Sequence, residues 1–221
     1  TIQITSRTTS QQSEAAQMPY QSPDFGLITP SLNATYWTNQ PGTQLTGVIT
    51  GSNLDDVYTG TPYAIDPLHA TIYGLTVNDA SGNTFIKSSS YDWPYGPNGS
   101  IASSTFNLGD GYVGIDSTIS SGNYGQNFVG NTVVMGSGNS DINISTGGSA
   151  YYAQTAFGAS LKAGGGQDSL NVSVNLPTDW VVSVGGSNID MGDGNDTISS
   201  IVTGHYNTNY TAFAITGSSV V

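Results

Sequence analysis

The sequence predicts an all-β protein, a right-handed parallel β-solenoid whose rungs are about 28 residues long and whose Gly/Asp turns stack along one edge. Three observations support this prediction. Helix patterns are scarce, short strand-like segments lie between turn residues, and the second half of the chain restarts at a Gly-x-Gly triplet at a nearly constant interval. Stacked coils repeat in this way because each rung must match its neighbours everywhere except where a loop bulges outward.

The strand-like segments are short. Only residues 10–18, SQQSEAAQM, could form one or two helical turns. Segments with strand character are bounded by Gly, Asn, Asp or Pro, and they span residues 1–5, 47–50, 70–77, 131–135, 169–174, 180–184 and 211–216. These segments suit a sandwich, a barrel or a solenoid equally well. The repeats therefore decide, and a Gly/Asn-rich sandwich whose turns recur by accident remains the alternative.

The repeats form four consecutive lines, which begin at Gly109, Gly136, Gly164 and Gly192, at intervals of 27, 28 and 28 residues. Each line continues with an aspartate, a short strand, a variable loop, an aromatic residue, and a strand interrupted by a glycine. The aromatic residues are Phe128, Phe157, Trp180 and Phe213, and the interrupting glycines are Gly130, Gly158, Gly185 and Gly217. We predict a solenoid over residues 47–221 with an aromatic loop insertion at 88–100, preceded by an N-terminal strand and extended segment over 1–46.

The charge composition excludes several partners. Charged residues make up only 8% of the chain, yet the formal net charge is −12, because fifteen acidic residues face only Arg7, Lys87 and Lys162. Nucleic acids and anionic membranes require clustered basic residues, so neither is an expected partner. There is no cysteine, and no apolar run is long enough to span a bilayer. The low lysine content and the abundance of Ser, Thr, Asn and Gly favour an extracellular or cell-surface location.

The Gly/Asp turns suggest calcium. All acidic residues except Glu14 are aspartates, the short carboxylate that suits turns and hard cations. In a stacked coil these turns lie about 4.8 Å apart, so their carboxylates repel one another unless a cation screens them. Stacked Asp and Asn turns held by hydrogen bonds without metal are the alternative.

Two stretches, GGGQDSLNV at 164–172 and GDGNDTISS at 192–200, resemble the nonapeptide G-G-x-G-x-D-x-U-x of RTX proteins, the hemolysin-type calcium-binding repeats. The resemblance implies a parallel β-roll in which turn carbonyls and aspartates bind Ca²⁺ while Leu170 and Ile198 point inward. GSGNSDINI at 136–144 has one extra residue before its aspartate, and the line from Gly109 delays its later aspartate to Asp116. RTX rolls repeat every nine residues with calcium at both edges, whereas this period implies a wider, three-faced coil with calcium at one edge.

The candidate calcium ligands follow from that resemblance and from the turns aligned with it. They are Asp110, Gly136, Gly138, Asp141, Gly164, Gly166, Asp168, Gly192, Asp193, Gly194 and Asp196. Asp79 is not expected to belong to this column of stacked turns.

Catalysis is not expected. The two histidines, His69 and His205, have loop-like surroundings and no metal-binding spacing. Asp55 and Asp56 are adjacent, so in a strand their side chains point to opposite faces and cannot form a carboxylate pair with each other. We therefore predict that the protein is not an enzyme.

The predicted function is that of an extracellular structural protein that assembles head to tail with copies of itself into a filament or surface layer stabilised by calcium. Its last line stops where another Gly-x-Gly turn is expected, and TIQITSRT at 1–8 could be a strand donated to the next subunit. The alternative for that strand is to fold back on its own solenoid. The alternative function is a carbohydrate-binding or carbohydrate-modifying β-helix module, such as a lyase-like or epimerase-like accessory domain, with cell-surface polysaccharide as its partner.

Overall fold

A computed structural model of the chain describes residues 5–8, 34–39, 44–52, 54–60, 70–92, 100–121, 124–148, 152–176, 180–203, 212–217 and 219–221. Within these ranges the chain forms strands and turns and contains no helix. The described residues therefore include no helix that could cross a membrane. The helical turns predicted at 10–18 lie outside the described residues. The chain is a parallel β-solenoid of about five turns with rungs of about 28 residues, which confirms the predicted fold class.

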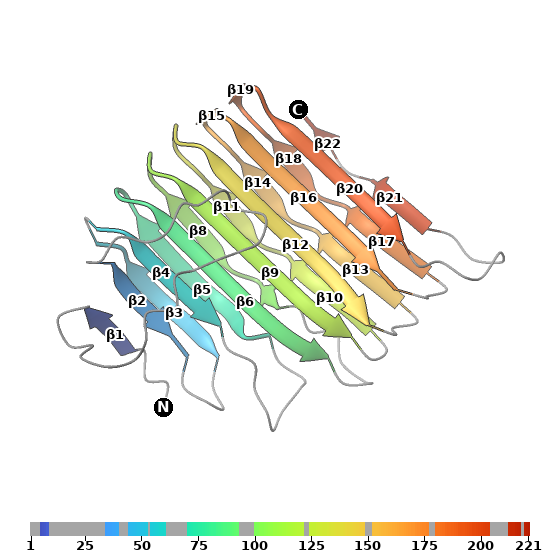
Figure 1. Ribbon diagram of the computed structural model, residues 1–221, viewed down its shortest axis with the longest axis horizontal. Helices are drawn as coiled ribbons and strands as arrows, with labels where there is room; N and C mark the ends of the chain where they lie inside the picture. The colour runs from blue at the N-terminus through green and yellow to red at the C-terminus, as the bar shows by residue number, and fades with distance from the viewer. Residues whose placement is uncertain are drawn as a thin grey trace.

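One flank of the solenoid is sheet A, whose strands lie side by side in the front of Figure 1. Within the described residues its eight strands, in spatial order, are β1 (Thr5–Thr8), β2 (Thr35–Thr38), β4 (Asp56–Gly60), β6 (Thr84–Asp92), β9 (Val113–Ser121), β12 (Ser140–Gly148), β16 (Asp168–Asn175) and β20 (Thr197–Thr203). β1 pairs antiparallel with β2, and every other strand pair in the described ranges is parallel. Sheet A therefore already includes β2, from the segment that the sequence separates from the solenoid.

The other two flanks belong to sheet B, which bends at β5 (Ile72–Asp79). One arm contains β7 (Ile101–Ala102), β10 (Tyr124–Val129), β13 (Tyr152–Phe157), β17 (Trp180–Gly185) and β21 (Ala212–Thr216). The other arm contains β8 (Thr105–Leu108), β11 (Thr132–Val134), β14 (Ser160–Lys162), β18 (Asn188–Asp190) and β22 (Ser219–Val220), and β3 (Leu45–Thr50) pairs with β5. Each later rung thus contributes three strands, as expected for a three-faced coil.

The core is a set of inward-facing columns. Burial alternates strictly along β12 and β16, because successive side chains of a strand point to opposite faces. The longest apolar column of sheet A contains Tyr58, Ile86, Ile115, Ile142 and Leu170, all nearly inaccessible to solvent. Trp37 packs against one end of this core, and Ile198 packs against the other. The predicted inward positions of Leu170 and Ile198 are therefore confirmed.

Polar side chains join the flanks inside the corners. Ser117 Oγ donates to Asn127 Oδ1 at 2.6 Å, and Asn127 Nδ2 donates to the Ser145 carbonyl of the next rung at 2.6 Å. In the following rung Thr155 Oγ1 donates to Thr146 Oγ1 at 2.9 Å. Hydrogen bonding satisfies these buried groups, so sheets A and B are held together by more than apolar contact.

The bend between the two arms of sheet B requires a left-handed backbone. Gly130, Gly158 and Gly217 lie at this bend with φ between 57° and 62°. These are the glycines that interrupt the last strand of their repeats in the sequence. In the third line the left-handed residue is Gly186, with φ 57°, so the choice of Gly185 is wrong by one residue. The reason is register: Gly185 pairs with Phe157, which places it at the end of β17 before the bend.

Candidate functional site

The turn edge is built by Gly-x-Gly turns that lie directly above one another. Gly136 N donates to the Gly109 carbonyl at 3.1 Å, and Asp193 N donates to the Gly164 carbonyl at 3.1 Å. In the last two turns the triplets themselves form a short parallel pair, β15 (Gly165–Gly166) with β19 (Asp193–Gly194). The predicted stacking of turns along one edge is therefore present.

Glycine is required in these turns because the backbones approach too closely for a side chain. A Cβ on Gly138 would lie 2.2 Å from the carbonyl oxygen of Gly111, and one on Gly194 would lie 1.9 Å from that of Gly166. Gly194 also has φ +156° and Gly192 has φ +72°, which L side chains rarely adopt. The motif glycines thus meet a steric requirement of the stack, whether or not a cation is bound.

The candidate aspartates lie in three different columns of this edge. Asp110 and Asp193 occupy the middle position of the triplet, since Asp110 contacts Ser137 and Asp193 pairs with Gly165. Asp168 and Asp196 share the next column, in which Ser140 lies below Asp168. Asp141 is one residue further along and pairs with Ser169, as the extra residue in its line suggests.

Most of these aspartates accept hydrogen bonds from a neighbouring rung. Asp110 Oδ1 accepts from Ser137 N at 2.9 Å and from Ser137 Oγ at 3.1 Å, and these bonds lower the pKa of Asp110. Asp141 accepts from Ser169 Oγ at 2.6 Å and from Tyr112 OH at 2.9 Å. The carboxylates therefore act as rung-to-rung clamps in addition to any role as ligands.

Asparagines perform the same clamping at equivalent turns. Asn83 Oδ1 accepts from Tyr112 N at 2.8 Å, and Asn139 Oδ1 accepts from Gln167 N at 2.9 Å. This is the hydrogen-bonded Asp/Asn ladder that the sequence leaves open as the alternative to calcium. Both amide and carboxylate oxygens are also ligands that Ca²⁺ accepts, so the ladder does not by itself decide between the two.

Asp168 differs from the other aspartates. It is only 3% exposed, Ser140 Oγ donates to Oδ1 at 2.6 Å, and Oδ2 is buried with no hydrogen-bond partner among the described residues. Burial raises the pKa of Asp168, the Ser140 hydrogen bonds oppose this rise, and the charges of Asp196 and Asp141 add to it. An unpartnered buried carboxylate oxygen is costly unless a proton or a cation reaches it.

A cation at Asp168 would have few carboxylate ligands. The part of the chain that the structure describes contains no group of three or more His, Cys, Asp or Glu side chains placed to hold a metal ion. Asp196 is one acidic neighbour, since its Oδ1 accepts from Asp168 N at 3.0 Å, and Asp141 is another whose charge acts on Asp168. The remaining oxygens around a Ca²⁺ ion would have to be turn carbonyls and water, which Ca²⁺ readily uses.

One carboxylate pair was missed from the sequence. Asp55 precedes β4 and accepts a hydrogen bond from Asn83 Nδ2 at 3.1 Å, whereas Asp56 begins β4 and is fully buried. Asp56 instead lies close to Asp79, which is 2% exposed and whose pKa is raised by burial and by the charge of Asp56. The sequence does contain a signal for the inward position of Asp79. Alternate residues of a strand share one face, so Asp79 lies on the same face as the apolar Leu75 and Val77. His69 and His205 lie outside the described residues.

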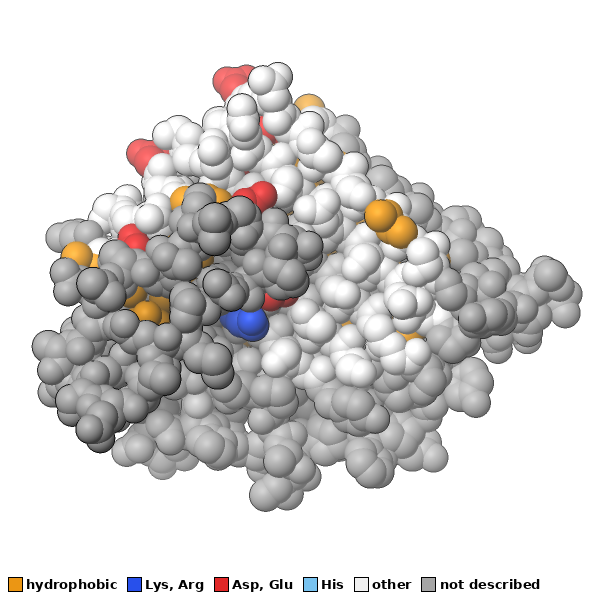
Figure 2. All heavy atoms as spheres, viewed as in Figure 1, with side chains coloured by type: hydrophobic (Ala, Val, Ile, Leu, Met, Phe, Trp, Pro, Cys, Tyr) orange, Lys and Arg blue, Asp and Glu red, His pale blue; other side chains and the backbone are white. Residues whose placement is uncertain are grey.

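Acidic side chains gather along the turn edge, visible at the upper left of Figure 2, whereas the neighbouring face of sheet A is largely uncharged. The architecture is compatible with the β-roll that the RTX resemblance implies. Comparisons of the chain with protein-family models, with curated proteins and with solved structures found no match.

Proposed function

We propose that this protein is an extracellular structural protein that assembles head to tail, with copies of itself, into a filament or surface layer, and that Ca²⁺ at the turn edge stabilises it as in RTX proteins. The observation that carries this proposal is the chemical difference between the two ends of the solenoid. Ends that differ can contact each other only in a heterologous way, which grows open chains when the contact does not close into a ring.

The N-terminal end is covered in sheet A. β1 pairs antiparallel with β2 of the same chain, from Thr5 opposite Thr38 to Thr8 opposite Thr35. Behind this edge the rings of Trp37 and Tyr58 are stacked, with centroids 6.4 Å apart and planes 7° apart. This pairing corresponds to the folded-back alternative for the N-terminal strand, and it protects an edge that would otherwise template strand addition.

The C-terminal end is more open. Among the described strands β20 pairs only with β16, and Ile201 on it is 53% exposed. Exposed large apolar residues concentrate at the two ends: of those in the described ranges, Val48, Leu54 and Tyr73 belong to the first turns, Ile201 and Val221 to the last, and Val134 alone to the middle. An unpaired strand edge beside exposed apolar side chains favours association.

Donation of β1, from the N-terminal segment 1–46, would join these two ends. In an assembly β1 would leave its own β2 and pair with β20 of the next copy, which covers the open edge of that β20 by strand addition. The pairing that β1 loses with β2 is replaced by its pairing with β20, so the donation costs little.

Deletion of Thr1–Gln12 should change the assembly. We expect the full-length chain with Ca²⁺ to scatter light increasingly with concentration, and the deletion variant to lose extended particles because β20 lacks its donated partner. Light scattering and negative-stain imaging measure both. If the deletion leaves assembly unchanged, strand donation is wrong, and if the full-length chain stays monomeric at high concentration, head-to-tail assembly is wrong as well.

The alternative function, carbohydrate binding, is favoured by the outer face of sheet A. There Asn171 Nδ2 donates to Asn143 Oδ1 at 3.0 Å and Ser173 Oγ donates to Ser145 Oγ at 3.1 Å, which gives uncharged ladders at strand spacing. Such neutral amides and hydroxyls suit a neutral polysaccharide. If this alternative holds, the protein should co-sediment with an insoluble neutral polysaccharide, and double substitution of Asn143 and Asn171 by aspartate should abolish that binding. Retention of the double variant on the polysaccharide would contradict it.

A further inference from the structure

Two buried carboxyl groups lie close together at the N-terminal end of the solenoid. Asp56, at the start of β4, is 0% exposed, and Asp79, at the end of β5, is 2% exposed. Both lie against residues 51–52, because Ser52 N donates to Asp56 Oδ2 at 2.6 Å and a Cβ on Gly51 would lie 2.5 Å from Asp79 Cγ. Two buried carboxylates in such proximity repel each other, so a proton on one of them is favoured.

The surrounding groups hold this pair between the first turn and the second rung. Ser52 donates to Asp56 twice, from N to Oδ2 at 2.6 Å and from Oγ to Oδ1 at 2.9 Å. Thr84 Oγ1 donates to Asp79 Oδ2 at 2.7 Å. Gly51 leaves room for the contact, since a Cβ there would lie 2.5 Å from Asp79 Cγ.

These contacts favour a proton over a metal ion between the two aspartates. The N–H and O–H groups of Ser52 and Thr84 direct hydrogen atoms at the carboxyl oxygens, and such donors would compete with a cation for the same lone pairs. Among the described residues, the charge that acts on Asp79 is that of Asp56, which is acidic and raises the pKa of Asp79. The remaining titratable neighbour is Tyr58, whose pKa is raised first by burial and then by Asp56 and Asp79.

We propose that Asp56 and Asp79 form a proton-operated latch, which fastens the turn between β3 and β4 (described residues 51–52 and 54–55) to the second rung while Asp79 is protonated and loosens that turn when the proton is lost. The latch goes beyond the proposed assembly and does not depend on it. Its site of action is still informative: the turn carries Leu54, which is 44% exposed, and follows β3, whose Val48 is 72% exposed. Loosening it would change the surface of the N-terminal end.

The direction of the pH dependence follows from the burial. Burial raises the pKa of Asp79 from its ordinary value of 3.8 to about 6, the hydrogen bond from Thr84 opposes this rise, and the charge of Asp56 adds to it. Because the folded-state pKa is the higher one, the stabilisation is fully present below the unfolded value and is lost as the pH rises through the folded value. The equilibrium constant for opening the turn should therefore increase by about tenfold for each pH unit between the unfolded pKa of 3.8 and the folded pKa of about 6. Above the folded pKa it should level off.

The test is hydrogen exchange at the Ser52 amide, corrected for the intrinsic pH dependence of exchange, in the full chain between about pH 4 and about pH 7. We expect protection to fall in the wild type, and to be nearly constant in Asp79→Asn, whose amide donates permanently to Asp56. Asp116→Asn, on the outer face of β9, should keep the wild-type profile.

A second variant keeps the proposal falsifiable if Asp79→Asn does not fold. Thr84→Val removes the hydrogen bond that lowers the pKa of Asp79, so it should move the midpoint of the loss to higher pH. The latch is overturned if the profile of Asp79→Asn or of Thr84→Val matches that of the wild type. It is also overturned if Ca²⁺ or K⁺ restores protection at neutral pH in the wild type but not in Asp79→Asn, because the pair would then be a cation site.

Discussion

Replacing Gly138 by alanine should lower the free energy of unfolding by about 3 kcal/mol. The added Cβ would lie 2.2 Å from the Gly111 carbonyl oxygen and 2.5 Å from that of Asp110, both of which are backbone atoms of the preceding rung. Neither atom can move without disturbing the rung-to-rung hydrogen bonds of the turn edge. Urea unfolding of the two proteins measures the difference.

Gly147 supplies the matched control. It lies in β12 of the same rung, but a Cβ on it would have no atom within 4 Å and its φ is not positive. Gly147→Ala should therefore change the free energy of unfolding by less than about 0.5 kcal/mol. Equal stabilities of the two variants would mean that the Gly-x-Gly turns do not stack at this separation.

Calcium should raise the stability of the wild type by about 2.7 kcal/mol when its free concentration is about a hundred times the Kd. The expected site includes Asp168, whose buried Oδ2 has no partner within the described residues, and Asp196 in the same column. Asp168→Asn keeps an oxygen for Ser140 but removes the charge, so this variant should lose most of the response to calcium. Melting curves in millimolar Ca²⁺ and in EGTA measure the response.

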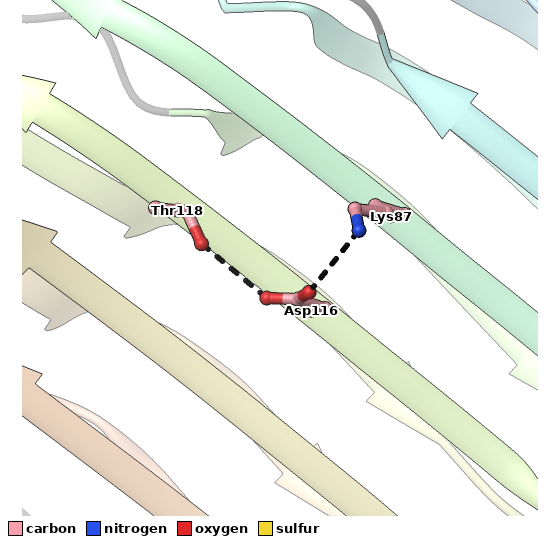
Figure 3. Close-up of polar contacts among 3 residues, drawn as sticks. All are labelled: Lys87, Asp116 and Thr118. Atoms are coloured by element: carbon pink, nitrogen blue, oxygen red, sulfur yellow. Dashed lines mark hydrogen bonds and ion pairs between the residues drawn. The ribbon is translucent and has the colours of Figure 1, made fainter. Parts of the chain in front are cut away.

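The control for calcium is Asp116→Asn. Asp116 lies on the outer face of β9, where it is 3.9 Å from Lys87 Nζ and accepts from Thr118 Oγ1 at 3.3 Å (Figure 3). A long, partly exposed ion pair of this kind contributes little to stability, and Asp116 lies away from the turn edge, so the variant should respond to calcium like the wild type. A wild-type melting curve that is identical in Ca²⁺ and EGTA would leave the Asp/Asn hydrogen-bond ladder as the whole explanation of the turn edge.

The solenoid and its period were predictable because their cause is local and repeats. In the last four turns a Gly-x-Gly triplet recurs where the turn backbones approach too closely for a side chain, so the spacing of these triplets reports the length of a rung directly. The choice of Gly185 as the interrupting glycine was wrong because it also relied on the position of glycines alone. Two consecutive glycines are equivalent in the sequence, and only the pairing of Gly185 with Phe157 places the left-handed bend at Gly186.

The candidate site was less predictable because its contacts cross between rungs. The column of Asp141 could be anticipated from one extra residue, but its bonds to Tyr112 and Ser169 depend on the register of three strands. The proximity of Asp56 and Asp79 joins residues of different strands through the interior. Alternation along β5 points Asp79 inward, but it does not say which side chain it meets there.

The most direct measurement of the central proposal is electron microscopy of the purified full-length chain with and without Ca²⁺. Head-to-tail stacking of calcium-stabilised solenoids predicts filaments or layers in Ca²⁺, with single particles or much shorter assemblies in EGTA. Uniform single particles in both conditions, at concentrations well above those used for unfolding, would contradict the proposal that the two ends of this solenoid bind each other.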